Sequence, residues 1–574
     1  MADYYFDATD GNDANNGTSE VTAWKTTVKF NSEMLAGTFA PAGVGKTIAF
    51  QRGETWRVSE AGEDPLRITD SGASGTPIVV TAYGSGTRPR ILGSSKAGPT
   101  WTDEGSSKWS ATWTAQGLQP GGNIGWLERS DGEVEEAGYV VDTASLVSNY
   151  QWTRVAGTPD KIWIYWDGGT PTFTFEGPLA ASGQSRDYCI GVYETSQSYV
   201  TIENFICRYG RDDGIILRPP TSGTISNIIV QDCEAGAYIN ASGRWDAGGG
   251  GQGFITHQSN TGSSVTNITV RRCRFYFAEN HGMQWINNNG TGTQSNIIYE
   301  ACEVFDCGHN LVDFNNQAGA LSNVTVRYCR LYVRDNFPRF GTLSSSGVAG
   351  IYLQPILAGL DMTGVELLYN LIYDTHGNGI SVAPWTDAAH TLTGKMIGNT
   401  IYGANRRNLG WLYNVRFSNN ASGTYDNWEL KNNINAFPRN GVACISFDNG
   451  LRGSTLDYNC YAVTSGIFAW QAGNSYSTIA AWRTATVQEA NSLLQDPLFV
   501  NTSDKNFSLQ ATSPSLNTGV DLGDTYDSGL DPVSTWPSGV QFKSQDAAGS
   551  GWEMGAYVYP TASPTDRIFI AVGG

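Results

Sequence analysis

The side chains best suited to chemistry lie between residues 211 and 354, at fixed positions after a recurring glycine or its equivalent. Alternation along an extended strand points the second and fourth residues after that glycine to the same side. The second followers are Ile216, Ile255, Gln284, Asp313, Tyr352 and Ser381, and the fourth followers are Arg218, His257, Ile286, Asn315, Gln354 and Ala383. Carboxyl, imidazole and phenol groups brought together in this way can donate and accept protons. The pattern therefore predicts one face that carries acid–base chemistry.

Asp313 is the first catalytic candidate, because it interrupts the apolar strand Leu-Val-Asp-Phe and is flanked by Gln284 and Tyr352 of the neighbouring repeats. Glu279, in the turn one repeat earlier, is its first partner carboxylate. Asp213 is a further partner, although an Arg-Asp-Asp-Gly sequence also suits a turn in which Asp side chains accept hydrogen bonds from exposed amides. Two carboxyl groups ~5–5.5 Å or ~6.5–9.5 Å apart can hydrolyse a glycosidic bond.

Other polar and aromatic residues in this region could bind a substrate. His281 and His309 lie in Gly/Asn turns, where a solvated or hydrogen-bonded imidazole explains them equally well. In the segment 243–254, four consecutive glycines follow Trp245 and Asp246 and allow close backbone approach or a movable flap. The Trp245 ring could stack on the apolar face of a sugar, and Asp246 is a third partner carboxylate. The remaining binding candidates are Arg218, Gln284, Asn315 and Gln354.

A repeat positions these residues, in segments such as 268–286, 324–333 and 396–412. One aligned column holds Cys233, Cys273, Cys302, Cys329, Asn370, Asn399 and Asn432, and three positions later come Tyr276, Phe305, Tyr332, Tyr373 and Tyr402. Successive anchors are 27 to 41 residues apart, which is too long for a hairpin, and helical periodicity is lacking. The repeat predicts coils of a parallel β-solenoid stacked ~4.8 Å apart. The Cys column then predicts buried thiols that continue as an Asn ladder, rather than disulfides.

The predicted fold is all-β: a single-stranded parallel β-solenoid with a small antiparallel β insertion near its N-terminus. Residues 1–94 are expected to form an N-terminal cap and the first coils, and the Trp-rich residues 95–190 the inserted subdomain. Residues 191–460 would form the central coils that carry the groove. Residues 461–574 would add the last coils, a short helix near 478–492 and a cap over the open edge.

Composition and charge exclude several classes of protein. The 574 residues carry a net charge of −18, without the clustered Lys and Arg that nucleic-acid binding requires. We find no run of ~18 apolar residues that could span a membrane. The nine cysteines include no Cys-x-x-Cys pair, which argues against a zinc site. The chain opens on a strand pattern without a signal peptide, so a leader has been removed or export does not use one.

Parts of the chain resemble the right-handed parallel β-helix superfamily of carbohydrate-active proteins, which is often called pectate-lyase-like. The segment YYFDATDGNDANNGTSEVTAWKT is similar to the amino-terminal signature of that group, and GKTIAFQRGETWR with TPIVVTAYGSGTRPRI is similar to its first coils. The usual closing motif resembles residues 496–501, 513–520 and 552–559. Members include lyases, glycoside hydrolases, epimerases and phage tailspikes. The resemblance therefore implies the fold and a polysaccharide or oligosaccharide partner, but leaves the reaction open.

We expect a polysaccharide-degrading enzyme, most simply a glycoside hydrolase that uses Asp313 and a neighbouring carboxylate. A polysaccharide lyase that uses Tyr352 or His257 with Arg218 stays an alternative, although lysine, a common base in lyases, is nearly absent from this region: only Lys395 occurs between residues 162 and 430. A tailspike or adhesin that binds glycan without cutting it is the third alternative.

The remaining expectations concern cofactors, assembly and location. No cofactor is required, but Ca²⁺ could bind the Asp/Asn-rich residues 7–17, which also suit a tight turn. A monomer and a trimer both fit the sequence. A polysaccharide substrate implies an extracellular protein, secreted or virion-associated.

Overall fold

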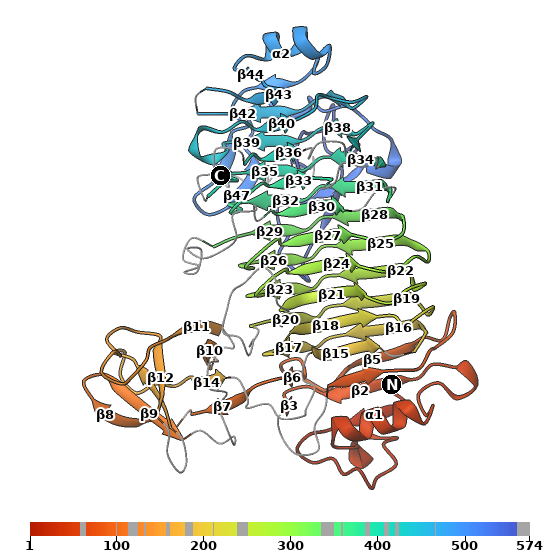
Figure 1. Cartoon of the computed structure of the whole chain (residues 1–574), viewed down its shortest axis with the longest axis vertical. Coiled ribbons are helices and arrows are strands. Elements are labelled where there is room, and N and C mark those ends of the chain that lie inside the picture. The colour runs from red at the N-terminus through yellow and green to blue at the C-terminus, as the bar shows by residue number, and fades with distance from the viewer. Residues whose placement is uncertain are drawn as a thin grey trace, which may run out of the picture.

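The computed structural model shows a long stack of coils with a smaller sheet beside its first coils (Figure 1). Two helices, α1 (Thr27–Leu35) and α2 (Ile479–Thr486), lie near the two ends of the stack. The described residues are 1–57, 65–98, 100–112, 124–130, 134–155, 161–177, 188–193, 195–210, 212–237, 251–334, 349–356, 360–384, 391–406, 412–418, 424–464 and 466–559.

Three long sheets form the walls of the stack, and successive strands of one coil fall in different sheets. The first sheet contains β1 (Tyr4–Phe6), β2 (Thr47–Gln51), β5 (Ile78–Tyr83), β16 (Gln197–Glu203), β19 (Thr224–Gln231), β22 (Ser264–Arg271), β25 (Gln294–Glu300), β28 (Leu321–Arg327), β31 (Met362–Leu368), β34 (Thr391–Ile397), β37 (Thr424–Tyr425), β38 (Glu429–Lys431) and β41 (Thr455–Asp457). The second contains β4 (Leu66–Ile68), β15 (Tyr188–Tyr193), β18 (Asp213–Arg218), β21 (Gln252–Gln258), β24 (Met283–Asn287), β27 (Val312–Asn316), β30 (Ile351–Pro355), β33 (Ile380–Val382), β36 (Val415–Phe417), β40 (Ile445–Phe447), β43 (Ala469–Gln471) and β44 (Asn474–Tyr476).

The third sheet has the shortest strands and closes each coil between the other two. It contains β3 (Thr55–Arg57), β6 (Arg90–Leu92), β17 (Ile206–Arg208), β20 (Glu234–Gly236), β23 (Arg274–Tyr276), β26 (Glu303–Phe305), β29 (Arg330–Tyr332), β32 (Leu371–Tyr373), β35 (Thr400–Tyr402), β39 (Ile434–Ala436), β42 (Cys460–Ala462) and β45 (Leu493–Leu494). Strands of neighbouring coils pair in parallel, as β16 with β19, β17 with β20 and β18 with β21 do. The predicted right-handed parallel β-helix is thereby confirmed.

The core between the sheets is built from ladders of equivalent side chains. All nine cysteines are free and buried, so the predicted thiol column is confirmed. The column then continues as buried amides, in which Asn370 Nδ2 donates to Asn399 Oδ1 at 3.0 Å and Asn399 Nδ2 donates to Asn433 Oδ1 at 3.0 Å. The predicted last member, Asn432, is wrong by one residue. Pairing of β34 with β38 aligns Asn433 with Asn399, and Asn432 instead bonds the backbone of Val520 in the C-terminal segment.

The aromatic column also stacks as predicted. Tyr276 and Phe305 have ring centroids 5.3 Å apart, Phe305 and Tyr332 are 5.1 Å apart, and Tyr332 and Tyr373 are 4.9 Å apart, with interplanar angles of 11° or less. Tyr402 follows Tyr373 in strand register. Stacked rings at the coil spacing bury apolar area and fix the register of the third sheet.

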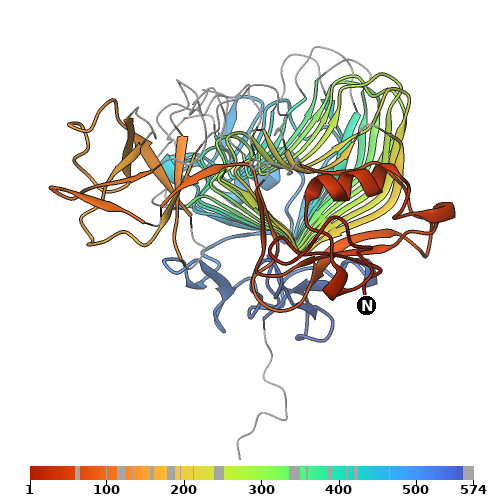
Figure 2. The same ribbon diagram turned by 90° about the horizontal axis from the view of Figure 1, so that it is seen from below.

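The inserted region forms a separate eight-stranded sheet that is antiparallel except for one pair, β11 with β12. Its strands in spatial order are β7 (Ser95–Ala97), β14 (Thr174–Gly177), β10 (Ile124–Glu128), β11 (Val134–Tyr139), β12 (Gln151–Val155), β13 (Lys161–Tyr165), β9 (Lys108–Thr112) and β8 (Thr102–Gly105). Seen along the stack, it projects sideways from the coils (Figure 2). The antiparallel insertion predicted near the N-terminus is confirmed, whereas β15 already pairs with the coil strand β18.

Buried polar contacts fasten this insertion to the coils. Arg57 of β3 pairs with Glu176 of β14 at 2.6 Å, and Arg90 of β6 pairs with Glu128 of β10. The hydroxyl of Tyr209, which follows β17, donates to the second oxygen of Glu128 at 2.6 Å. Removing one partner of such a buried set leaves a charge uncompensated, which is strongly destabilising. The orientation of the insertion therefore depends on these contacts.

After helix α2, two small antiparallel pairs follow: β46 (Phe499–Asn501) with β47 (Asn506–Leu509), and β48 (Ser528–Leu530) with β49 (Phe542–Ser544). Helix α2 lies within the segment predicted to be helical, and Thr478 accepts a hydrogen bond from Ala481 N at its start. Among the described helices, none is long and apolar enough to cross a membrane.

A buried carboxyl at the end of the amide ladder should make stability depend on pH. Burial raises the pKa of Glu489 from its ordinary 4.5 to about 7, against hydrogen bonds from Ser492, Tyr461 and Asn459 that lower it. The folded protein therefore holds this proton more tightly than the unfolded chain. The resulting stabilisation is complete below pH 4.5 and is lost as the pH rises through about 7.

We expect Glu489→Gln to remove this contribution, because the amide keeps the shape of the protonated carboxyl. Denaturant unfolding of both proteins at several pH values between 4 and 8 would show the wild type losing on the order of 3 kcal/mol relative to the variant. The exposed Glu20→Gln variant is the control. A difference between wild type and Glu489→Gln that is independent of pH would contradict the assignment.

Candidate functional site

Strand register places the predicted second followers in one row on the outside of the second sheet. Gln284 pairs with Asp313, Asp313 with Tyr352, and Tyr352 with Ser381. The residues that come directly after the first three lie in the central core: Trp285, Phe314 and Leu353. Because successive residues of a strand point to opposite faces, the row itself points outward.

The fourth followers form a second outward row beside the first. His257 pairs with Ile286, Ile286 with Asn315, and Asn315 with Gln354. The side chains of His257 and Asn315 are half-buried, and Gln354 is buried. The two rows therefore give this face of the second sheet a mixed polar and apolar surface.

Asp313 is held by two amides in a nearly dry position. Its side chain is 1% exposed. Gln284 Nε2 donates to Oδ2 at 3.0 Å, and Asn310 Nδ2 donates to Oδ1 at 2.9 Å. Gln284 accepts from Gln252 Nε2 at 3.2 Å, and Asn310 Oδ1 accepts from the backbone N–H of Ala349 at 2.8 Å, so both amides are fixed in orientation. Burial raises the pKa of Asp313 above its ordinary value of 3.8, although the bonds from Gln284 and Asn310 lower it.

Two imidazoles lie against this carboxyl. His281 Nε2 is 3.7 Å from Asp313 Oδ2, and His309 Nδ1 is 3.3 Å from His281 Nε2. The two rings meet edge to face, with centroids 4.7 Å apart. Burial lowers the pKa of each imidazole to about 3, and for His309 the neighbouring His281 contributes. Both rings are therefore neutral near pH 7 and can exchange hydrogen bonds without adding charge.

Tyr352 adds a phenol on the other side of Asp313. Burial and the Asp313 carboxyl raise the pKa of Tyr352, which keeps its proton in place. Within the described part of the chain, Asp313 forms no ion pair with a Lys or Arg. Arg416, three coils beyond Asp313 in the same row, pairs with Asp448 at 2.9 Å. The arrangement is thus a set of neutral proton donors and acceptors around one buried carboxyl.

Two of the three predicted partner carboxylates, Glu279 and Asp213, lie in the described part of the chain. Glu279 is 3% exposed and lies two residues before His281. It packs on the backbone at Gly251, where an added Cβ would come within 2.6 Å of the Glu279 Cβ. Asp213 lies on β18, three coils before Asp313 on β27, which is ~14 Å at the coil spacing. That exceeds the ~9.5 Å over which a carboxyl pair acts on one bond, so Asp213 is too far away, and Glu279 stays the candidate partner among the described residues.

The residues of the alternative lyase site are not brought together. His257 lies on β21, three coils before Tyr352 on β30. Burial lowers the pKa of His257 to about 4, and Arg218 lowers it further. The Arg218 guanidinium lies 5.5 Å from the ring centre of Tyr193. Trp245 and Asp246 lie outside the described residues.

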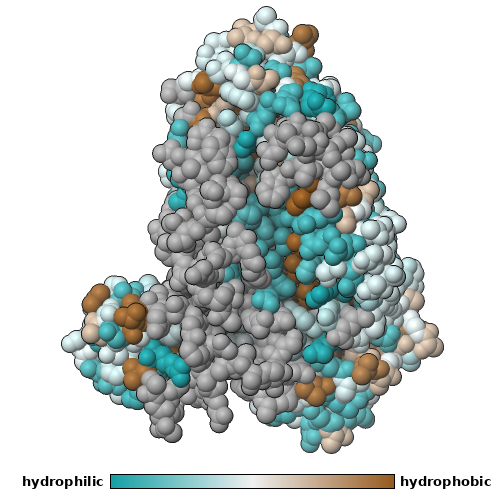
Figure 3. All heavy atoms as spheres, in the orientation of Figure 1, coloured by the Kyte–Doolittle hydropathy of each residue, from teal (hydrophilic) through white to brown (hydrophobic). Residues whose placement is uncertain are grey.

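Sequence reasoning left Asn310 and Gln252 out of the site. Asn310 was visible as a turn residue next to His309, but its bond to Asp313 follows from the turn geometry. Gln252, which follows the four glycines, reaches Asp313 only through Gln284. Ile216 and Ile255 continue the Asp313 row towards the N-terminal coils, and with Tyr188 and Ile286 they form an apolar patch that alternation alone could have suggested. Figure 3 shows the surface above the second sheet as a largely hydrophilic band with hydrophobic spots.

The Asp/Asn-rich residues 7–17 form turns in which side-chain oxygens accept backbone hydrogen bonds. Asp7 Oδ1 accepts from the N–H groups of Thr9 and Asp10, and Asp13 Oδ1 accepts from Lys25 and Thr26. In the part of the chain that the structure describes, no group of three or more His, Cys, Asp or Glu residues is placed to hold a metal ion. Calcium binding here stays a prediction.

Comparison with known proteins yields matches of fold only. Neither a family model nor a curated protein matches the chain. Pectate lyase Pel9A is similar over 98% of both chains, with 11% identity and a TM-score of 0.48. The GH136 lacto-N-biosidase from Eubacterium ramulus aligns over 86% of this chain and 67% of its own, with 12% identity and a TM-score of 0.43. The tailspike gp49 from Acinetobacter baumannii bacteriophage Fri1, a capsular polysaccharide depolymerase, aligns over 85% and 65%, with 8% identity and a TM-score of 0.29.

The neutral state of the site imidazoles is directly testable. Because burial lowers the pKa of His281 and His309 to about 3 and that of His257 to about 4, all three should stay neutral at pH 5. Long-range ¹H–¹⁵N spectra of histidine-labelled protein, recorded between pH 5.5 and 7.5 and assigned with His→Gln variants, would show no titration of these rings. A histidine-containing model peptide is the control, with its midpoint near ~6.5. A titration midpoint of His281 close to that of the peptide would show that water reaches the ring.

Proposed function

We propose that this protein is a polysaccharide-degrading enzyme, and that it hydrolyses glycosidic bonds with Asp313 as the general acid. The observation that carries the proposal is the state of Asp313: a buried carboxyl with a raised pKa, fixed by Gln284 and Asn310 on an outward row of the second sheet. A general acid must hold its proton near the working pH, and burial is the usual means of achieving this in glycosidases. Tyr352, which pairs with Asp313 in strand register, and His309 are both half-buried.

In this mechanism Asp313 donates its proton to the glycosidic oxygen while the bond from that oxygen to the anomeric carbon breaks. Water adds to the anomeric carbon, and its proton passes to the second carboxylate, for which Glu279 is the candidate. His281, being neutral, lies 3.7 Å from the carboxyl without adding charge, and both imidazoles can bind substrate hydroxyls by hydrogen bonds. Tyr352 offers a further O–H group.

The charges around Asp313 favour hydrolysis over β-elimination. Elimination from a uronic acid needs a base and a cation that neutralises the sugar carboxylate. The raised pKa of Tyr352 makes its phenolate costly to form, and the neutral histidines supply no positive charge. Among described residues the nearest arginine of the same row, Arg416, is already paired with Asp448. A neutral or weakly charged glycan therefore fits the site best.

A polysaccharide lyase stays the second candidate, because Tyr352 is adjacent to Asp313 and could act with it on one sugar. For either reaction, a polymer can extend along the outward rows, since they continue over several coils. Such a substrate suits an extracellular protein, secreted or attached to a virion. The proposal also includes Ca²⁺ binding by residues 7–17, and assembly as a monomer or a trimer.

The products distinguish these reactions. We expect digestion of a panel of neutral and uronic-acid polysaccharides to release reducing ends without the rise in absorbance near 235 nm that an unsaturated uronate gives. Asp313→Asn should lower kcat by about 10³-fold, since general acid catalysis is worth roughly 10²–10⁴, and Glu279→Gln should do the same. Asp232→Asn, in the turn after β19, is the folded control. Unsaturated products would show that the reaction is elimination and not hydrolysis. Full activity of Asp313→Asn would show that Asp313 is not the general acid.

The pH profile tests the role of Asp313 as an acid. Activity should fall as the pH rises through the raised pKa of this group, because only the protonated form can donate. The bond from Gln284 lowers that pKa, so Gln284→Met should move the alkaline limb of kcat/KM to higher pH. Gln231→Met, on the first sheet, should leave the limb in place. A shift to lower pH in Gln284→Met would mean that another group sets the limb.

A further inference from the structure

A row of asparagines lies on the outer face of the first sheet, well apart from the Asp313 row on the second. Asn267 Nδ2 donates to Asn227 Oδ1 at 3.2 Å, Asn296 Nδ2 donates to Asn267 Oδ1 at 2.8 Å, and Asn323 Nδ2 donates to Asn296 Oδ1 at 3.0 Å. Each of the four has a left-handed backbone, with φ between 55° and 60°. Asparagine tolerates that conformation better than most residues. Glycine takes the position in the next coil, as Gly364 with φ 64°.

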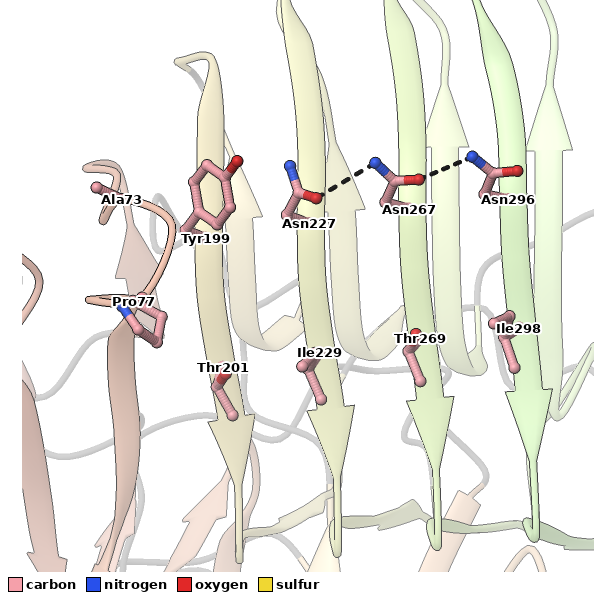
Figure 4. Close-up of a pocket in the computed structure, with 11 residues that line it drawn as sticks. Ala73, Pro77, Tyr199, Thr201, Asn227, Ile229, Asn267, Thr269, Asn296 and Ile298 are labelled. Carbon is pink, nitrogen blue, oxygen red and sulfur yellow. Dashed lines mark hydrogen bonds between the residues drawn. The ribbon is translucent and has the colours of Figure 1, made fainter.

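A cavity of about 380 Å³ lies along this row (Figure 4). Figure 4 shows two parallel rows of outward side chains, the asparagines with Tyr199 in one and alternating Thr and Ile residues in the other. The lining consists of eleven uncharged residues: Ala73, Gly75, Pro77, Tyr199, Thr201, Asn227, Ile229, Asn267, Thr269, Asn296 and Ile298. In a chain with a net charge of −18, an uncharged lining of this length selects against charged ligands.

The polar groups of the row are arranged for hydroxyl ligands. Asn267 and Asn296 are exposed, and each uses one N–H and one oxygen lone pair within the row. A second N–H and a second lone pair remain on each amide, so the row offers donors and acceptors in alternation. Sugar hydroxyls both donate and accept, and Tyr199, Ile229 and Ile298 supply the apolar surface on which sugar C–H faces pack.

We propose that this cavity is a second glycan-binding site, which takes a neutral oligosaccharide segment lying across β16, β19, β22 and β25. The choice of a glycan rests on the proposed function, because a polymer held at the Asp313 row can reach another face of the same stack. The repeat of one amide per coil, ~4.8 Å, suits an extended chain of sugars that runs along the stack. The site binds and does not cut, since its lining contains no ionisable carboxyl or imidazole.

The test measures binding in Asp313→Asn protein, in which the proposed chemistry is disabled. Calorimetric titration with neutral hexasaccharides of glucose and of xylose should give two sites per chain, and hexagalacturonate should leave the second site empty. Asn267→Gly keeps the left-handed backbone and removes one amide from the cavity, so it should weaken the second site about tenfold, the equivalent of one or two hydrogen bonds. Asn323→Gly is the matched control: it has the same conformation in the same row, but does not line the cavity.

In enzyme with Asp313 intact, Asn267→Gly should raise KM for the long polymer and leave turnover of a short oligosaccharide unchanged. If glycans bind but no polymer is cut, the proposed function fails and the second site stands. Equal affinities for Asn267→Gly and Asn323→Gly would overturn the second site and leave the Asp313 proposal untouched. Concentration-dependent dimers or trimers that Asn267→Gly abolishes would overturn it as well, because the face would then be an interface between copies of the chain.

Discussion

In-register parallel pairing of successive coils is the constraint on which the rest of this structure depends. Each hydrogen-bonded strand fixes the position of the equivalent strand one coil later, so a residue type repeated at that position becomes a physical row. Buried thiols and amides form such rows inside, aromatic rings form one on the outer face of the third sheet, and Gln284, Asp313 and Tyr352 form one on the outer face of the second. A slip of one residue in any strand would exchange the two faces. Core packing and site geometry are therefore aspects of a single alignment.

The pKa shifts in the site around Asp313 are caused by burial rather than by pairing with opposite charges. Burial raises the pKa of Asp313 and lowers those of His281 and His309, so all three tend towards their neutral forms. The charged networks of the molecule lie elsewhere, for example where Arg57 and Glu176 fasten the insertion. Because these ion pairs lie away from Asp313, the groups around Asp313 can be polar and uncharged.

The sequence permits prediction of what repeats. Period-two alternation and the recurring glycine identify the row of Gln284, Asp313 and Tyr352, because both depend only on local geometry and coil length. The sequence does not show which residues adopt the left-handed turn between two strands. For this reason Asn432 is predicted in the amide ladder, at the position that Asn433 occupies. Contacts made through turns, such as that of Asn310 with Asp313, need coordinates.

Contacts between distant segments are equally invisible in the sequence. Arg57 and Glu176 are 119 residues apart, and nothing in either neighbourhood indicates that they pair. The outer asparagine row is a different case, because an Asn stands at the same place in successive repeats, as Asn227, Asn267 and Asn296 do. Its spacing follows the same period as the buried columns, so the sequence does contain the information that aligns these amides.

The amide-to-amide hydrogen bonds of each of the two amide rows run in one direction along the stack. Inside, Asn370, Asn399 and Asn433 each donate to the amide oxygen of the next coil as well as to a backbone carbonyl of an earlier one, and the side-chain series ends at the carboxyl of Glu489 through Asn459. Outside, Asn267, Asn296 and Asn323 direct their N–H groups towards earlier coils. The donor-to-acceptor series of the two rows thus run in opposite directions along the axis of the stack, and the hydrogen bonds of each row polarise one another along its length.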